Sequence, residues 1–152
     1  MPHFTTRRRV RHSAADMFDL VADVEKYPQF VPLCTGLRVR SRTPKGETNV
    51  IVAVMTVAYK LIHQSFTSRV TLDRARLTIL VEYLDGPFSR MQNRWTFRQT
   101  SEISSDVEFF IDYEFRSRTF AMLAGAVFDT VFRRMAAAFE KRADQVYGRK
   151  LA

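Results

Sequence analysis

Apolar and polar residues alternate with a period of two through the middle of the chain and recur with a helical period near its two ends. A period of two predicts β-strands, because successive side chains of a strand point to opposite faces. The alternation predicts a first strand over residues 4–12. It also predicts six further antiparallel strands, over residues 37–42, 47–59, 63–72, 76–83, 91–98 and 106–115.

A short helix is expected after the first strand. The side chain of Ser13 can accept a hydrogen bond from the backbone N–H three residues on, and Asp16 stands where a capping-box acid belongs. Apolar residues then follow at helical spacing. Pro28 ends this helix, because the residue before a proline is pushed out of helical geometry.

A long helix is predicted from Phe120 to Tyr147, a segment without proline that Gly148 ends. At about 1.5 Å per residue it is roughly 40 Å long, so that only a curved sheet can cover it. Residues 149–152 have the character of a frayed tail. The helix carries one broad apolar stripe, formed by Phe120, Leu123, Ala124, Val127, Phe128, Val131, Met135, Phe139 and Val146.

Two prolines fix the apolar segment from Tyr27 to Cys34, which lies between the short helix and the second strand. Neither a helix interior nor a central strand tolerates two prolines at this spacing. A solvated loop would be more polar. The segment therefore packs in an irregular form, either as a plug in the core or as a cover at the mouth of a cavity.

Length and charge narrow the class of protein. The 152 residues predict one domain over residues 1–152, large enough to bury a core without staples. A single cysteine favours a reducing compartment, and no apolar run is long enough for a signal peptide or a membrane span. Lys and Arg number 24 against 16 Asp and Glu, and 19 of the 24 are Arg. This excess favours an anionic partner, namely lipid headgroups, ribosomal RNA or an acidic protein face.

Residues that could perform catalysis are sparse. The three histidines, His3, His12 and His63, lack the spacing of metal ligands, and one cysteine cannot build a thiolate site. A nucleophile made of Cys34 and His63 is conceivable, but a cysteine beside prolines in apolar sequence is typical of inert packing. We therefore predict a binding protein that is not an enzyme, without metal or catalytic cofactor.

Five motifs in one order resemble the coenzyme Q-binding protein family of the START-like, polyketide cyclase and lipid transport superfamily. They are residues 23–34 (DVEKYPQFVPLC), 66–70 (FTSRV), 85–88 (DGPF), 95–97 (WTF) and 139–143 (FEKRA). The resemblance implies an α+β helix-grip fold, in which a curved antiparallel sheet of six or seven strands wraps a long C-terminal helix and two short helices follow the first strand. One departure is Leu33, where many members carry tryptophan before the cysteine.

The family implies binding of ubiquinone or a related prenyl lipid in a hydrophobic cavity, in support of respiratory electron transport. It also implies a place in the bacterial cytoplasm, peripheral to the inner membrane, through contact with anionic lipid. The same pattern occurs in bacterial ribosome-association toxins, which bind the large ribosomal subunit and block subunit joining. A third hypothesis is a small cyclase or dehydratase, since the fold also hosts enzymes.

Apolar side chains line most ligand cavities, so the candidate site residues are apolar and aromatic. At the open end we expect Phe18, Val21, Tyr27, Phe30, Val31, Leu33 and Phe88, and deeper inside Val54, Trp95, Ile111, Val127 and Val131. The candidate polar partners of a quinone head are Tyr27, Thr56, Asn93 and Tyr113, and the candidate membrane contacts are Arg7, Arg9, Arg116 and Arg118. Aspartate in place of Phe30 and Val31 is expected to abolish lipid loading without unfolding the domain.

Overall fold

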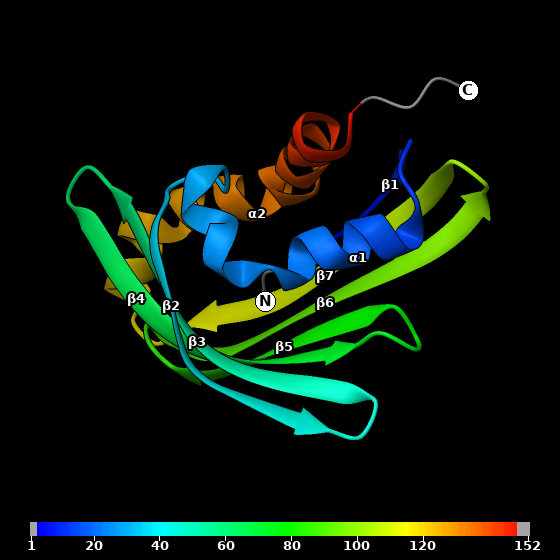
Figure 1. Ribbon diagram of the computed structural model, residues 1–152. Coiled ribbons are helices and arrows are strands. Elements are labelled where there is room, and N and C mark those ends of the chain that lie inside the picture. Colours follow the sequence, from blue (N-terminus) through cyan, green and yellow to red (C-terminus); the bar gives the residue numbers. More distant parts are fainter. Residues whose placement is uncertain (1–2, 149–152) are drawn as a thin grey trace.

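The computed structural model describes residues 3–148 and shows a curved antiparallel sheet that wraps a long C-terminal helix (Figure 1). The expected tail at 149–152 lies outside the described residues. The elements in chain order are β1 (His3–Val10), α1 (Ala14–Ala22), the 3-10 helix η1 (Val24–Gln29), β2 (Cys34–Lys45), β3 (Thr48–Tyr59), β4 (Ile62–Asp73), β5 (Thr78–Asp85), β6 (Phe88–Ser101), β7 (Ser104–Phe115) and α2 (Arg118–Tyr147). The predicted fold class is confirmed.

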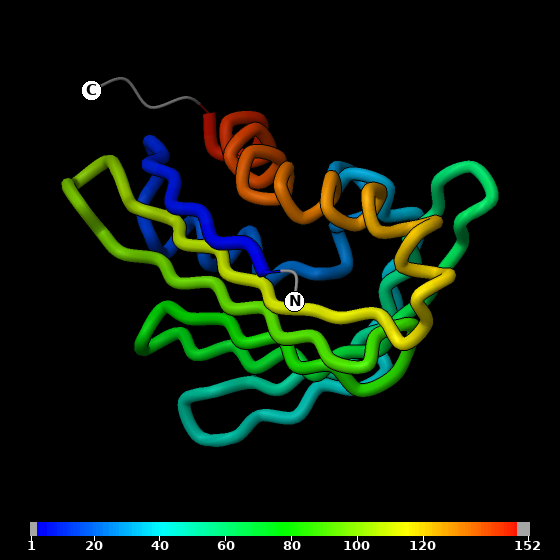
Figure 2. Tube along the Cα trace, turned by 180° about the vertical axis from the view of Figure 1, so that it is seen from behind, coloured from blue at the N-terminus to red at the C-terminus, as the bar shows by residue number. Residues whose placement is uncertain are grey.

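The sheet has seven strands in the order β1-β7-β6-β5-β4-β3-β2, and every neighbouring pair is antiparallel. Strands β2 to β7 form a meander in which each strand pairs with the next. The last strand, β7, also pairs with the first strand, β1, as Figure 2 shows from behind. The two edges of the sheet are therefore β1 and β2. Pro44, which cannot donate to a ladder, lies on the edge strand β2.

The core lies between the concave face of the sheet and the helices. Met91, Asn93, Trp95 and Phe97 of β6 are all buried, as the period of two predicted. The matching residues of β7 also face inward, and they pack against the apolar side of α2. The alternation in sequence thus fixed which face of these two strands meets α2.

The first helix differs from the prediction in length. Ser13 caps α1 as expected, accepting a hydrogen bond from the Asp16 backbone N–H at 3.1 Å. The helix does not run to Pro28 but ends at Ala22, and a separate 3-10 helix then contains Pro28. The two helices are joined by a buried hydrogen bond of 2.5 Å from the Tyr27 hydroxyl to the Val21 carbonyl oxygen. This bond satisfies a carbonyl at the end of α1, where no further backbone N–H of the helix is available.

Candidate ligand-binding site

An open apolar groove of about 560 Å³ lies between the β3–β4 turn and the first turns of α2. Figures 1 and 2 both place this turn and the start of α2 at the same end of the molecule. The volume is within the range of about 300–1,000 Å³ that is usual for small-molecule sites. The groove is lined by Tyr59, Lys60, Leu61, Ile62, His63, Gln64, Phe120, Leu123 and Val127.

Local structure fixes both walls of the groove. The ladder between β3 and β4 ends at the pair Tyr59 and Ile62, so that only two residues form the turn. On the other side, the Ser117 hydroxyl caps α2 by accepting a hydrogen bond of 3.1 Å from the Phe120 backbone N–H. Leu123 belongs to the predicted apolar stripe of α2, yet it is 70% exposed. The stripe therefore extends along α2 beyond the part that the sheet covers, and its uncovered end forms a wall of the groove.

A smaller internal cavity of about 80 Å³ lies deeper, between the concave face of the sheet, η1 and α2. Since one water needs roughly 10–15 Å³ by this measure, the cavity has room for several waters but not for a quinone ring with its tail. It is lined by Val24, Tyr27, Leu37, Ala53, Met55, Phe66, Ser68, Val70, Ile79, Val81, Met91, Asn93, Trp95, Ile111, Phe132 and Met135.

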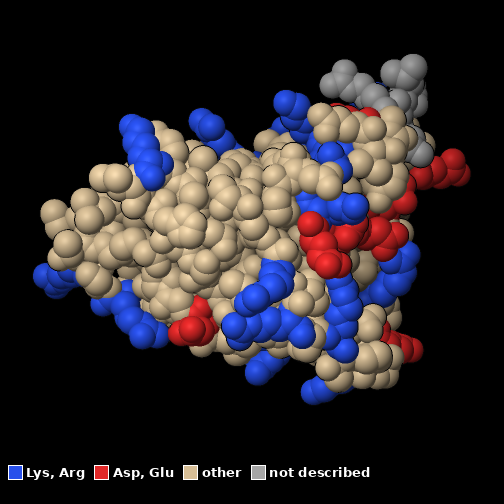
Figure 3. All heavy atoms as spheres, turned by 60° about the vertical axis from the view of Figure 1, so that its left-hand side comes forward, with Lys and Arg blue, Asp and Glu red and all other residues tan. Residues whose placement is uncertain are grey.

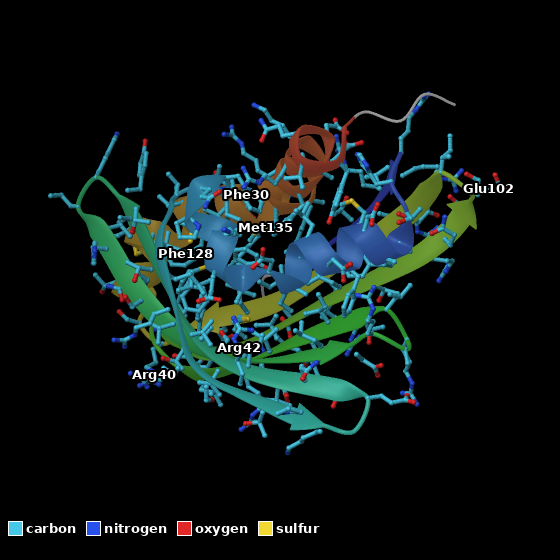
Figure 4. All side chains as sticks on the ribbon, viewed as in Figure 1. Phe30, Arg40, Arg42, Glu102, Phe128 and Met135 are labelled. Atoms are coloured by element: carbon cyan, nitrogen blue, oxygen red, sulfur yellow. The ribbon has the colours of Figure 1, made fainter. Side chains whose placement is uncertain are left out.

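An aromatic cluster lies between the groove and the cavity. Ring contacts run from Phe120 in the groove to Phe128 at 6.3 Å and on to Phe132 in the cavity at 6.1 Å. Phe88, which has no exposed surface, packs against Phe128 and Phe66 at 5.6 Å each. Figure 4 shows Phe128 and Met135 on the side of α2 that faces the sheet. These rings separate the two spaces in this conformation.

The structure brings together only some of the residues predicted for the site. Tyr27, Trp95 and Ile111 line the internal cavity, and Val127 lines the groove. Five others are packed in the core without lining either space, namely Phe18, Val21, Val31, Phe88 and Val131. Phe88 was expected at the open end, but its position in the centre of the aromatic cluster makes it a core residue.

Two predictions about location need correction. Val54 lies on the convex face of the sheet, because its neighbours Ala53 and Met55 are the ones that face the cavity. Both faces of β3 are apolar in sequence, so periodicity could not assign its inner face. The Tyr27–Cys34 segment does not form the mouth either. Phe30 packs edge-on against Phe139 at 5.0 Å, and Leu33 is partly buried against the core at a φ of 61°.

Sequence reasoning missed the β3–β4 turn. Tyr59 to Gln64 contains no glycine or proline and reads as a short gap between two strands, so nothing marked it as part of a site. The exposure of Leu61 at the tip of this hairpin is visible only in the structure. Ser68 was also missed. It is a buried polar residue among the apolar residues of the cavity.

The predicted polar partners have different surroundings. Asn93 accepts a hydrogen bond from the Trp95 indole at 3.1 Å and donates to the Phe110 carbonyl at 2.8 Å, and its side chain borders the cavity. Burial raises the pKa of Tyr113, which packs against Phe132 of α2. Thr56 lies on the convex face, where its hydroxyl pairs with that of Ser65 at 2.8 Å. Only Tyr27 and Asn93 therefore border the cavity.

Cys34 and His63 have different surroundings. Cys34 is buried, and desolvation raises the pKa of its thiol to about 11, so the thiol stays protonated at neutral pH. His63 is exposed at the groove. Within residues 3–148, His, Cys, Asp and Glu form no group of three that could hold a metal ion. In the same range, no helix has the length and apolarity needed to cross a membrane.

A curved antiparallel sheet that wraps a long terminal helix and leaves an apolar groove at one end defines a START-like protein. A START superfamily protein from Mycobacterium smegmatis shares this fold, with a TM-score of 0.77 at 21% identity over 95% of this chain and 98% of that chain. The chain belongs to the polyketide cyclase/dehydrase and lipid transport family, whose model matches residues 10–140.

Two relatives with different names are similar to this chain. The ribosome association toxin RatA of Escherichia coli K12 is 36% identical over 97% of this chain and 90% of that protein. The mitochondrial coenzyme Q-binding protein COQ10 homolog B of Xenopus laevis is 32% identical over 91% of this chain and 56% of that protein. The resemblance to the coenzyme Q-binding family and to the ribosome-association toxins is thereby confirmed.

Proposed function

We propose that this protein is a single lipid-binding domain that holds ubiquinone or a related prenyl lipid without transforming it. The observation that carries the proposal is the open apolar groove of about 560 Å³ at the β3–β4 turn. The likeness to a protein named for coenzyme Q binding supports the choice of lipid. A role in respiratory electron transport would follow from delivery of the quinone to or from a membrane.

The isoprenoid tail would lie in the groove between Leu61, Phe120 and Val127. Each CH₂ removed from water contributes about 0.8 kcal/mol, so a dry groove can hold the tail outside a bilayer. The net gain over the bilayer itself is close to zero, which makes transfer reversible. Entry of the ring into the inner cavity would require the aromatic cluster to move, and there Ser68 and Asn93 could donate hydrogen bonds to a quinone oxygen.

The protein carries its own reporter, since Trp95 is its one tryptophan and borders the inner cavity. Protein purified from its native host is extracted with organic solvent, and the extract is analysed for quinone by mass spectrometry. Ubiquinone is then titrated while Trp95 fluorescence is recorded. We expect a quinone in the extract and saturable quenching. If neither is seen, the quinone proposal is withdrawn.

A pair of variants links the quenching to the groove. Val127→Asp places a charge in the groove, which an apolar tail cannot solvate, and should abolish binding. Thr130→Asp places the same charge less than one turn further along α2, at an exposed position, and should leave binding unchanged. Equal binding by both variants would show that the ligand does not occupy this groove.

A second candidate function is ribosome association, which the 36% identity to the toxin favours. On the convex face, many arginines already pair with acids, as Arg9 does with Asp106 at 2.8 Å. Within residues 3–148, Arg38 and Arg40 of the edge strand β2 are exposed and have no acidic partner, and Figure 4 shows Arg40 pointing outward. These two arginines are the candidate contacts with ribosomal RNA phosphates.

Co-sedimentation tests this candidate. In low salt the protein should appear in large-subunit fractions, and replacement of Arg38 and Arg40 by glutamine should reduce that amount. Absence of the wild-type protein from these fractions would exclude the ribosomal role.

A further inference from the structure

Three large apolar side chains protrude into solvent at the end of the molecule where the groove opens. Leu61 is 101% exposed, Met122 87% and Leu123 70%. Single exposed apolar residues are common on soluble proteins. Leu61 and Leu123 line opposite walls of one groove, however, and Met122 precedes Leu123 in α2, so exposed apolar side chains gather as a rim at this end.

One of the two residues at the tip of the β3–β4 turn has a backbone conformation that residues other than glycine disfavour. Lys60 has a φ of 54°, in the left-handed region where tight hairpins normally place Gly or Asn. The following residue is the fully exposed Leu61. Neither residue is the choice that would make the turn most stable or most soluble. A left-handed φ also occurs at Leu33 and Leu77, which pack against the core, so the full exposure of Leu61 is what distinguishes this turn.

The charged residues of the two rim segments are all basic. The segments 59–64 and 116–127 carry Lys60, Arg116 and Arg118 and contain no Asp or Glu. A nearby acid is Asp85, the last residue of β5 before the turn to β6. In Figure 3, which brings the left-hand side of Figure 1 forward, uncharged side chains cover most of the left half and Lys or Arg lie at its edges, while most acidic side chains lie on the right. Anionic groups at this end would meet cations.

Resting on the proposed function, we propose that the β3–β4 turn and the first two turns of α2 form a docking surface for an anionic lipid bilayer. Leu61, Met122 and Leu123 enter the acyl region, and Lys60 and Arg118 remain at the level of the headgroups. Tyr59 is 41% exposed with the Lys60 ammonium 5.2 Å from its ring, an arrangement that suits the boundary between apolar and polar layers. The groove would then open directly into the membrane.

Vesicle flotation tests the docking surface. Unilamellar vesicles of phosphatidylcholine with 30 mol% phosphatidylglycerol are compared with vesicles of phosphatidylcholine alone. The variant Leu61→Ser/Met122→Ser/Leu123→Ser should lower the partition coefficient on anionic vesicles by on the order of 100-fold. The matched control is Val146→Ser, which removes a half-exposed apolar side chain at the far end of the same helix and should bind as the wild type does.

The basic residues have a matched control as well. Lys60→Gln and Arg118→Gln should each weaken binding to anionic vesicles by about fivefold and should leave binding to neutral vesicles unchanged. Lys45→Gln removes one exposed cation at the β2–β3 turn and should have no effect. Equal binding of the triple serine variant and the wild type, or equal effects of Lys60→Gln and Lys45→Gln, would overturn the docking surface.

Quinone binding is measured separately, with a short-tailed, water-soluble ubiquinone analogue and Trp95 fluorescence. Met122→Ser/Arg118→Gln changes two residues that do not line the groove. If this variant still binds the analogue but floats with anionic vesicles less than the wild type does, docking and ligand binding are distinct steps and the docking surface is supported. If the wild type floats but binds no analogue, the docking surface stands and the quinone proposal fails. If the triple serine variant instead loses only co-sedimentation with ribosomes, the rim is a ribosome contact and membrane docking is refuted.

Discussion

The replacement Tyr27→Phe tests how much one hydrogen bond stabilises the Tyr27–Cys34 segment against α1, because it removes the hydroxyl and leaves the ring. The Tyr27 hydroxyl donates to the Val21 carbonyl oxygen at 2.5 Å, and both residues are buried. Since Val21 is next to the last residue of α1, its carbonyl has no helical N–H as an alternative donor. Loss of a buried partner costs about 1–3 kcal/mol. Tyr27→Phe should therefore be destabilised by that amount.

Urea unfolding followed by Trp95 fluorescence measures this effect, since Trp95 and Tyr27 both contact the Phe139 ring, at 5.1 and 5.2 Å. With an m-value of about 2 kcal/mol/M for a chain of this size, the midpoint should fall by roughly 0.5–1.5 M. Tyr59→Phe is the matched control, because Tyr59 is 41% exposed and its midpoint should change little. Equal midpoints for Tyr27→Phe and the wild type would show that the hydroxyl does not hold the segment.

Four further predictions follow from the core. Gly86→Ala should lower the free energy of unfolding by about 2–5 kcal/mol, because Gly86 has a φ of 144° and a Cβ there would lie 2.6 Å from the Phe66 Cβ. Urea unfolding measures this loss, and a loss below about 1 kcal/mol would contradict the geometry. Burial raises the pKa of the Cys34 thiol to about 11, so as the pH rises the unfolded chain loses this proton before the folded protein does. The free energy of unfolding should therefore fall between about pH 9 and pH 11, and it should fall less in Cys34→Ala. The same burial should make native Cys34 react with a thiol reagent at pH 8 at least about 100-fold more slowly than the unfolded chain, and equal rates would be contrary to it. The double variant Phe30→Asp/Val31→Asp should unfold, because Val31 is only 4% exposed and a buried aspartate there would be unpaired. This differs from the expectation from sequence, and a native circular dichroism spectrum of the variant would contradict the prediction.

The sequence predicted the fold well where one physical rule acted alone. Strands β6 and β7 alternate cleanly, so their inner faces were correctly assigned down to Asn93 and Trp95. Ser13 and Gly148 were correctly identified as the ends of helices, because capping depends on neighbours in the chain. Val54 was misplaced because both faces of β3 are apolar, and only pairing with β4 decides which face turns inward.

The location of the site depends on contacts between segments that are far apart in the sequence. The two-proline segment looked like a cover because it is apolar and irregular, but those properties also suit a clamp that closes the core. In the structure it is such a clamp, with Phe30 and Tyr27 packed on Phe139 of α2. Apolar composition does not distinguish these two roles. The distinction requires knowing which segment the helix meets.

The apolar stripe of α2 shows how one helix can serve both the core and a site. Its middle part, including Phe128 and Phe139, is covered completely by the sheet, η1 and the Tyr27–Cys34 segment, whereas Val146 near its C-terminal end is half exposed. Near its start, Leu123 continues the same stripe past the edge of that cover and remains exposed. A fold selected for stability alone would end the stripe where the cover ends, because exposed Leu gains nothing in water. The uncovered part of the stripe, opposite an exposed Leu61, is therefore best explained by an apolar partner, and the groove between them is where that partner would bind.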